Sequence, residues 1–126
     1  MTTTRTERRV ARSPWASEAL GLQLQHTTLI HGLDSMVLAD AAGNLWAASQ
    51  LDRGRAHLAS TVADTGSLGR GGRFTIARQR GRSVTVRRLR VGRATLFLAA
   101  EGQQPRCEKA LDQARPGVER ILTGIA

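Results

Sequence analysis

The sequence predicts one α/β domain of the α+β kind, with its elements in the order α-β-β-α-β-β-β-α. Three segments carry apolar residues at helical intervals, and the segments between them carry alternating or continuous apolar residues. The chain has 126 residues, of which 40% are hydrophobic, enough for a single domain with a buried core. We assign residues 13–126 to this domain. Residues 1–12, with four arginines and one acid, are predicted to be a mobile basic tail.

The first predicted helix begins at Ser13 as N-cap, with Pro14 in the first turn, and ends near Gly32. The larger of its two apolar stripes is expected to face the core. This stripe comprises Trp15, Ala19, Leu22, His26, Leu29, Ile30 and Leu33. We therefore expect His26 to be an interior, hydrogen-bonded imidazole. A shorter stripe on the opposite side is formed by Leu20 and Leu24, and a helix that is apolar on two sides usually contacts two neighbours.

A β-hairpin is predicted for residues 35–49. Two short apolar runs there flank a turn that contains Asp40, Gly43 and Asn44. A second helix is expected from about Asp52 to Leu68. Its apolar positions are Leu51, Leu58, Ala59, Val62 and Ala63.

Residues 73–100 change to a period of two, which predicts three strands with turns at residues 80–82 and 92–93. Val84 and Val86 share one parity, whereas Leu89 and Val91 resume on the other. We therefore expect a β-bulge at residues 87–88. Residues 94–100 are almost continuously apolar, which predicts a central strand.

The closing segment predicts an amphipathic helix whose apolar stripe runs from Cys107 to Ile125. Pro116 interrupts the backbone hydrogen bonding but not the stripe, so we expect one kinked helix. Cys107 belongs to the stripe and is expected to be a buried, unreactive thiol. Because it is the only cysteine, an internal disulfide framework and a multi-cysteine zinc site are excluded.

In this order of elements and in its motifs, the segment from residue 16 to residue 125 resembles a roadblock (dynein light chain type) domain. The resemblance rests on "HGLDSMVLAD" at the end of the first helix, the hairpin "MVLADAAGNLWAAS", the meander "GRFTIARQRGRSVTVRRLRVGRATLFLAA" and the closing helix. Family members typically show glycine, a hydrophobic residue, aspartate and glycine before "VLVD-x-x-G". The matching positions hold Gly32, Leu33, Asp34, Val37, Leu38, Asp40 and Gly43, and Ser35 replaces the usual second glycine.

The resemblance implies a five-stranded antiparallel sheet between helices. It also implies a homodimer, or a heterodimer with a related roadblock chain, built by the second helix and the third strand. The residues that would contribute to this interface are Leu58, Ala59, Val62, Phe74 and Ile76. Such dimers typically bind or regulate Ras-like small GTPases or scaffold motor and signalling complexes, and bacterial relatives include the partner of a Ras-like polarity GTPase. Independently, the third strand would be an exposed sheet edge unless something paired with it.

Positive charge is the strongest anomaly of the sequence. Nineteen basic against ten acidic residues give a net charge of +9, and residues 70–93 hold nine arginines and no acid. A solvated sheet face would explain this run, but arginine is also favoured where a protein binds the carboxylates of an acidic partner. We predict such a partner-binding surface at Arg78, Arg80, Arg82, Arg87, Arg88 and Arg90. Nucleic acid and lipid headgroups are the other anionic partners that this charge suits.

No catalytic signature is present in the sequence. Residues 66–72 are rich in glycine but lack the Lys-Ser/Thr of a phosphate loop. His31, Asp34 and Ser35 are close in sequence, which does not make a hydrogen-bonded relay. The three histidines lack metal-binding spacing, so we expect no metal, no cofactor and no enzymatic activity. There is no run of about 18 apolar residues, so we expect no membrane span, and the single cysteine fits the cytoplasm.

The sequence therefore predicts a non-catalytic dimeric module that binds or regulates a Ras-like small GTPase or a related signalling or motility complex. The alternative is a basic nucleic-acid-binding protein that uses the arginine-rich strands of residues 70–93. Aromatic residues, on which bases would stack, make up only 3% of the chain and disfavour it. A small-ligand sensor with a similar sheet ranks last, because the chain is short for an enclosed pocket.

Overall fold

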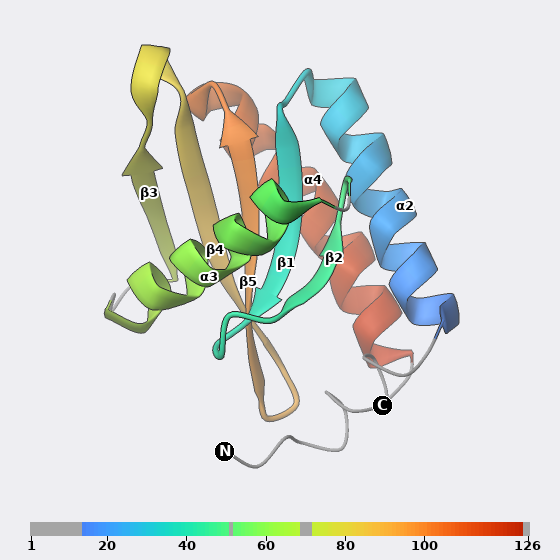
Figure 1. The fold of residues 1–126 in the computed structure, drawn as a ribbon. Helices are drawn as coiled ribbons and strands as arrows, with labels where there is room; N and C mark the ends of the chain where they lie inside the picture. Colours follow the sequence, from blue (N-terminus) through green and yellow to red (C-terminus); the bar gives the residue numbers. More distant parts are fainter. Residues whose placement is uncertain (1–13, 51, 69–71, 125–126) are drawn as a thin grey trace.

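The computed structural model describes residues 14–50, 52–68 and 72–124 (Figure 1). The elements are α2 (Pro14–His31), β1 (Ser35–Asp40), β2 (Leu45–Ala48), α3 (Arg53–Leu68), β3 (Arg73–Ala77), the 3-10 turn η1 (Gln79–Gly81), β4 (Ser83–Val91), β5 (Ala94–Gly102) and α4 (Gln104–Thr123). The predicted order of helices and strands is confirmed. The predicted basic tail, residues 1–12, and the proposed N-cap Ser13 lie outside the described residues.

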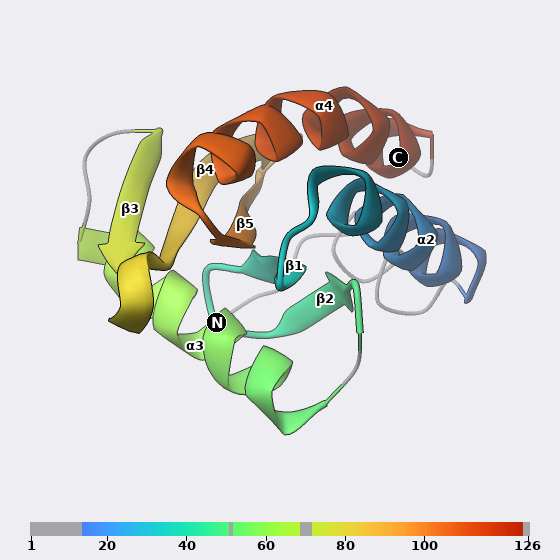
Figure 2. The same cartoon turned by 90° about the horizontal axis from the view of Figure 1, so that it is seen from above.

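The five strands form one antiparallel sheet in the order β2-β1-β5-β4-β3. α2 and α4 lie side by side on one face of the sheet, and α3 covers the other (Figures 1 and 2). β5 is the central strand, as its continuous apolar run predicts, and β2 and β3 are the edges. The expected five-stranded sheet between helices is confirmed.

The two faces of the sheet bury separate apolar clusters. The cluster under α2 and α4 includes Leu20, Leu24, Met36, Leu38, Leu96, Leu98, Leu111 and Leu122. The cluster under α3 comprises Val37, Ala48, Leu58, Val62, Val84, Val86, Phe97 and Ala99. Both faces of the central strands are thus covered. Each Å² of apolar surface removed from water stabilises the folded state by about 25 cal/mol.

β4 pairs with β5 without a bulge, which corrects the sequence prediction. The register between the two strands is uninterrupted along their whole length, including residues 87–88. Val84 and Val86 face α3, whereas Leu89 and Val91 face the α2–α4 layer. The apolar residues change parity because the first half of β4 packs against α3 and the second half against the opposite layer, while the strand alternates regularly.

A single carboxylate organises the β1–β2 turn. Asp40 Oδ1 accepts hydrogen bonds from the backbone N–H groups of Ala42 (2.9 Å) and Asn44 (3.0 Å). Asp40 Oδ2 accepts from Asn44 Nδ2 (3.1 Å) and Trp46 Nε1 (2.9 Å). Gly43 has a φ of +89°, which glycine adopts without steric cost. The predicted hairpin is confirmed, and two of its motif residues shape the turn.

α2 turns its larger apolar stripe away from the core, so the sequence prediction is wrong on this point. Trp15, Leu22, Leu29 and Ile30 are 61%, 57%, 76% and 55% exposed. His26 is also exposed and is not an interior imidazole.

The shorter stripe of α2 faces inward because it fits closely against α4. Leu20 and Leu24 are fully buried, together with Thr27, whose hydroxyl donates to Gln23 O (2.8 Å) within the helix. A Cβ on Gly117 of α4 would lie 2.7 Å from Gln23 Oε1, so the two helices approach closely there. The side chains of Leu20 and Leu24 leave room for this close approach at Gly117, whereas the stripe that contains Trp15 is too bulky for it.

α4 continues as one helix across Pro116, as expected for a single closing helix. The predicted burial of Cys107 is confirmed, and desolvation raises the pKa of its thiol, which disfavours the reactive thiolate. Within the described ranges, no helix has both the length and the apolar character needed to cross a membrane.

Candidate functional site

β3 forms one edge of the sheet and leaves a row of backbone groups open on its outer side. Among the described residues it pairs with β4 alone, as the sequence predicts for the third strand (Figure 1). Phe74 and Ile76 of β3 are half-buried against the apolar cluster under α3. The rings of Phe74 and Phe97 pack edge to face, with their centroids 6.4 Å apart. An open edge with partly covered apolar residues is a pairing surface for another chain.

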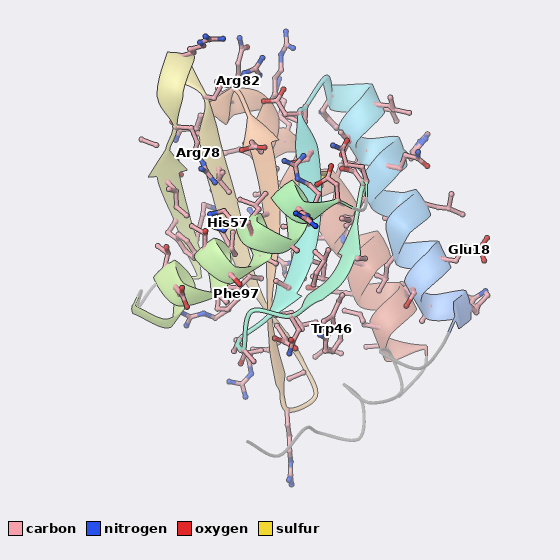
Figure 3. All side chains as sticks on the ribbon, in the orientation of Figure 1. Glu18, Trp46, His57, Arg78, Arg82 and Phe97 are labelled. Atoms are coloured by element: carbon pink, nitrogen blue, oxygen red, sulfur yellow. The ribbon has the colours of Figure 1, made fainter. Side chains whose placement is uncertain are left out.

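Three of the five predicted interface residues lie inside the protomer. Leu58, Ala59 and Val62 lie on the sheet-facing side of α3 and are buried, so in this structure they stabilise the core of their own chain. The other two predicted residues, on β3, border the open edge. The outward face of α3 is polar and includes the exposed His57 (Figure 3). Apolar spacing along α3 therefore indicates its sheet-facing side, and an interface on this helix would use the polar side.

Arg78, Arg80 and Arg82 lie in the turn between β3 and β4, and Figure 3 labels the first and the last of them. The N–H of Arg78 donates to Arg82 O (2.8 Å), which closes the turn. Arg80 and Gly81 have φ values of 61° and 71°. The left-handed conformation costs a non-glycine residue about 1 kcal/mol, and here it places the Arg80 side chain in solvent.

Two of these arginines line a hollow of about 580 Å³ that we call the balanced hollow. It is lined by Asp34, Ala77, Arg78, Arg82 and Glu101. Arg82 Nη1 lies 3.2 Å from Asp34 Oδ2, and Arg78 Nε lies 3.9 Å from Glu101 Oε2. Arg55 Nη2 of α3 is 3.8 Å from Glu101 Oε1. Because two arginines face two carboxylates, the balanced hollow has little net charge to attract a further anion.

Arg87 and Arg88 point to opposite faces of the sheet, since neighbouring residues of a strand alternate. Arg87 is only 8% exposed, and its Nη2 lies 2.5 Å from Asp112 Oδ1 of α4. Arg88 faces α3, donates to Gly66 O (3.1 Å) and lies 5.9 Å from the centre of the Phe97 ring. Both arginines therefore make contacts that hold helices to the sheet.

The six arginines of the predicted partner-binding surface do not form one patch. Three lie at the β3–β4 turn, and Arg87 and Arg88 contact helices on the two faces. Arg90 is exposed at the far end of β4.

A second hollow, of about 460 Å³, has a surplus of positive charge, and we call it the basic hollow. It is lined by Gly72, Arg73, Arg87, Arg88, Asp112 and Arg115. Asp112 Oδ1 pairs with both Arg87 and Arg73, and Arg73 Nη2 lies 3.9 Å from it. Arg115 Nε lies 2.9 Å from Glu119 Oε1, which is outside the hollow. The Arg88 side chain points to the α3 face, so the guanidinium groups of Arg73, Arg87 and Arg115 and one carboxylate line this hollow. Such an arrangement suits a further carboxylate or phosphate supplied by a partner.

Arg73 and Arg115 are not among the residues of the predicted partner-binding surface. Arg73 begins β3 and Arg115 lies on α4, and only the packing of α4 along the β3–β4 side of the sheet brings them together. The spacing of Arg115 and Glu119 indicates an exposed helix face but gives no sign of the hollow.

His31, Asp34 and Ser35 are the residue types of a catalytic triad, but each contacts a different partner. His31 Nε2 is hydrogen-bonded to the side chain of Gln113, and Asp34 pairs with an arginine of the balanced hollow. Ser35 Oγ donates to Glu101 Oε1 (3.3 Å). In the part of the chain that the structure describes, no group of three or more His, Cys, Asp and Glu residues is placed to hold a metal ion.

Neither a family model nor a curated protein matches the sequence. Solved structures do match the fold, among them three of MglB. A structure of MglB with a tetrameric arrangement has a TM-score of 0.69 and 18% identity, over 90% of this chain and 95% of that one. The gliding protein MglB from Thermus thermophilus has a TM-score of 0.69 and 16% identity, over 89% and 94%. Myxococcus xanthus MglB has a TM-score of 0.63 and 13% identity, over 100% and 96%.

The chain thus shares the roadblock-like fold of MglB over nearly its whole length. The sequence resemblance to roadblock domains is confirmed at the level of the fold. At these identities the likeness concerns the fold and assigns no residue a role.

Proposed function

We propose that this chain is a non-catalytic regulator that acts as a dimer and binds a Ras-like small GTPase or a related signalling or motility complex. The roadblock-like fold supports this, because roadblock dimers typically bind such GTPases and one protein of similar fold is a gliding protein. The observation that carries the proposal is the basic hollow beside the open β3 edge.

A second copy, or a related roadblock chain, would pair along β3. An antiparallel pair of β3 strands would satisfy the open backbone groups and cover more of Phe74 and Ile76. The outward side of α3, with His57, would then lie beside the same helix of the partner. Leu58, Ala59 and Val62 support this interface indirectly, because they hold α3 on the sheet.

An acidic group of the GTPase would enter the basic hollow. Arg73 and Arg115 are about half exposed and can turn toward a carboxylate, while the buried Arg87 holds its position. The arginines at the β3–β4 turn, Arg80 and Arg82, would attract the partner at longer range and increase the association rate.

Light scattering after size exclusion tests the dimer. The chain has a mass of 13.6 kDa, and we expect twice this mass at micromolar concentration. Thr75→Lys with Ala77→Lys should give the monomer, because lysines on the β3 edge place like charges opposite one another. Gln103→Lys with Gln104→Lys adds the same charge at the start of α4 and should leave the dimer intact. A wild-type monomer at these concentrations would refute this part of the proposal.

Affinity capture from nuclease-treated lysate of the source organism tests the partner. The experiment is run at about 150 mM salt, where charges act over about 8 Å, with GTP and GDP analogues in parallel. We expect a small GTPase, recovered more strongly in one nucleotide state. Arg73→Glu with Arg115→Glu should abolish its capture, and Arg80→Glu with Arg82→Glu should weaken it. Arg93→Glu with Arg120→Glu changes the charge equally at exposed positions outside α3, β3 and the basic hollow, and is the matched control.

Nucleic acid is the other anionic partner for the arginines. If no GTPase is captured and nucleic acid binds when nuclease is omitted, the GTPase proposal is wrong. That binding would weaken steeply as salt is raised, because it would rest on phosphate contacts.

A further inference from the structure

The outer surface of the α2–α4 layer combines exposed apolar residues with positive charge. All the large apolar side chains that are exposed in the described residues lie on α2, and they are Trp15, Leu22, Leu29 and Ile30. The first three are seven residues apart, so they form one line along the helix. This line faces away from the sheet, because Leu20 and Leu24 on the opposite side are buried. Glu18, three residues after Trp15 and four before Leu22, lies within this line and also points outward (Figure 3).

A row of basic side chains runs along the neighbouring helix. Arg106, Lys109 and Arg120 of α4 are exposed. Lys109 and Arg120 are eleven residues apart, which is about three turns, so they share a line on the helix surface. Arg106 lies on the side of α4 next to α2, because its Nη1 is 3.1 Å from the position of a Cβ on Gly32.

The three acids of α4, Glu108, Asp112 and Glu119, are four and seven residues apart and so share its other side, which Asp112 places toward β3 and β4. Asp112 pairs with two arginines of the basic hollow, and Glu119 pairs with Arg115. The outer α2–α4 surface is therefore positive beside its apolar line, and Glu18 is the single acid of α2 on it. In the sequence, the twelve residues before α2 add four arginines and one acid.

We propose that this helical surface, formed by Trp15, Leu22, Leu29, Ile30, Arg106, Lys109 and Arg120, binds an anionic lipid bilayer. The apolar line enters the boundary between headgroups and acyl chains, and Trp15 takes the interfacial position that tryptophan favours. The basic row lies against the lipid phosphates, where each lysine or arginine adds to binding. Apolar insertion and basic charge together give the two signals that stable attachment to a membrane surface requires.

Charge complementarity selects the bilayer over a second copy of the chain. Two copies packed through this surface would bring their basic rows together, and each chain already has a net charge of +9. The β3 edge lies away from the outer surface of α2 and α4 (Figure 2). The basic hollow lies on the side of α4 that bears Asp112 and Arg115, toward β3 and β4. A bilayer and a protein partner can therefore be bound at the same time.

Co-sedimentation of the full chain with vesicles tests this proposal. One vesicle population is pure phosphatidylcholine, and the other contains about one quarter phosphatidylglycerol, at about 100 mM salt. We expect binding to the anionic vesicles only. Leu22→Ser with Leu29→Ser should reduce the partition coefficient about tenfold or more, since both side chains are exposed in the free protein and apolar burial is lost on the membrane. Circular dichroism checks that this variant keeps its fold.

The charge of α4 is tested separately. Lys109→Gln with Arg120→Gln should reduce partitioning about tenfold or more. Arg53→Gln with Arg93→Gln removes the same charge elsewhere and should change partitioning far less. Equal losses in the two pairs, with no effect of the serine pair, would mean adsorption by overall charge and would overturn the proposal. Absence of vesicle binding would also overturn the proposal. So would a wild-type oligomer that dissociates on Leu22→Ser with Leu29→Ser, because a second copy of the chain would then cover this surface.

Discussion

Gly66 of α3 lies so close to Phe97 of β5 that no side chain fits at position 66. A Cβ there would be 2.5 Å from Phe97 Cε1 and 2.7 Å from Cζ. The ring is held in place by Phe74, which meets it edge to face, and by the guanidinium of Arg88 on it. This contact sets how closely α3 packs on the sheet.

Gly66→Ala should therefore destabilise the protein although alanine favours a helix. The helix propensity gained is about 1 kcal/mol, whereas overpacking against an aromatic ring costs about 1–3 kcal/mol and also displaces α3. Urea denaturation measures the change. Gly72→Ala is the control, because no atom lies within 4 Å of its Cβ position, and it should change stability little. Equal stability of both variants would show that α3 can shift without cost.

Asp40→Ala should destabilise the β1–β2 hairpin. The substitution removes the acceptor of four hydrogen bonds, two from backbone N–H groups and two from the side chains of Asn44 and Trp46. We expect a loss of about 1–3 kcal/mol in the free energy of unfolding. Trp46→Phe removes one of these bonds and should cost less. A loss from Trp46→Phe as large as that from Asp40→Ala would assign the stability to ring packing instead.

Asp52 makes stability depend on pH at the acid end. Its pKa lies below the ordinary value of 3.8, first because its carboxylate accepts a hydrogen bond from the N–H of Arg55 (2.8 Å), and second because of the Gln50 side chain. A carboxyl group with a lowered pKa stabilises the folded state above its unfolded pKa, and this contribution is lost as pH falls through the folded pKa.

Asp52→Asn keeps an oxygen that can cap α3 but does not titrate. The melting temperature of wild type should therefore approach that of the variant as pH falls below about 4. Thermal unfolding followed by circular dichroism across this range measures the difference. Two curves that stay parallel would exclude Asp52 as a source of acid sensitivity.

Arg87→Glu should lower the free energy of unfolding more than a charge reversal at an exposed position does. It would place a second carboxylate beside Asp112 at a position that is 8% exposed, at a cost of about 2–4 kcal/mol. Arg80→Glu, in solvent at the β3–β4 turn, should change stability by less than about 0.5 kcal/mol. Chemical denaturation of the two variants gives the comparison. Similar midpoints would show that Arg87 is not held by its buried contacts.

Much of the fold could be predicted because its signals are local. Asp40 and Gly43 mark the first hairpin turn, and residues 92–93 mark the last one with Gly92 at a φ of +61°. The candidate site was predicted less well. Its arginines are conspicuous in the sequence, but Arg87 and Arg88 contact helices on opposite faces, and Arg115 joins the basic hollow from a distant segment.

By itself the sequence determined which segments become helices and strands, because hydrophobic period and turn residues act among near neighbours. Only the tertiary structure decided which side of α2 is buried. Both sides are apolar, and the choice depended on how closely Leu20 and Leu24 let α4 approach. It likewise decided that Leu58 and Val62 serve the core and that one side of β4 meets α3 while the other meets α4. A side chain's role in these places depends on what packs against it, and that partner is distant in the chain.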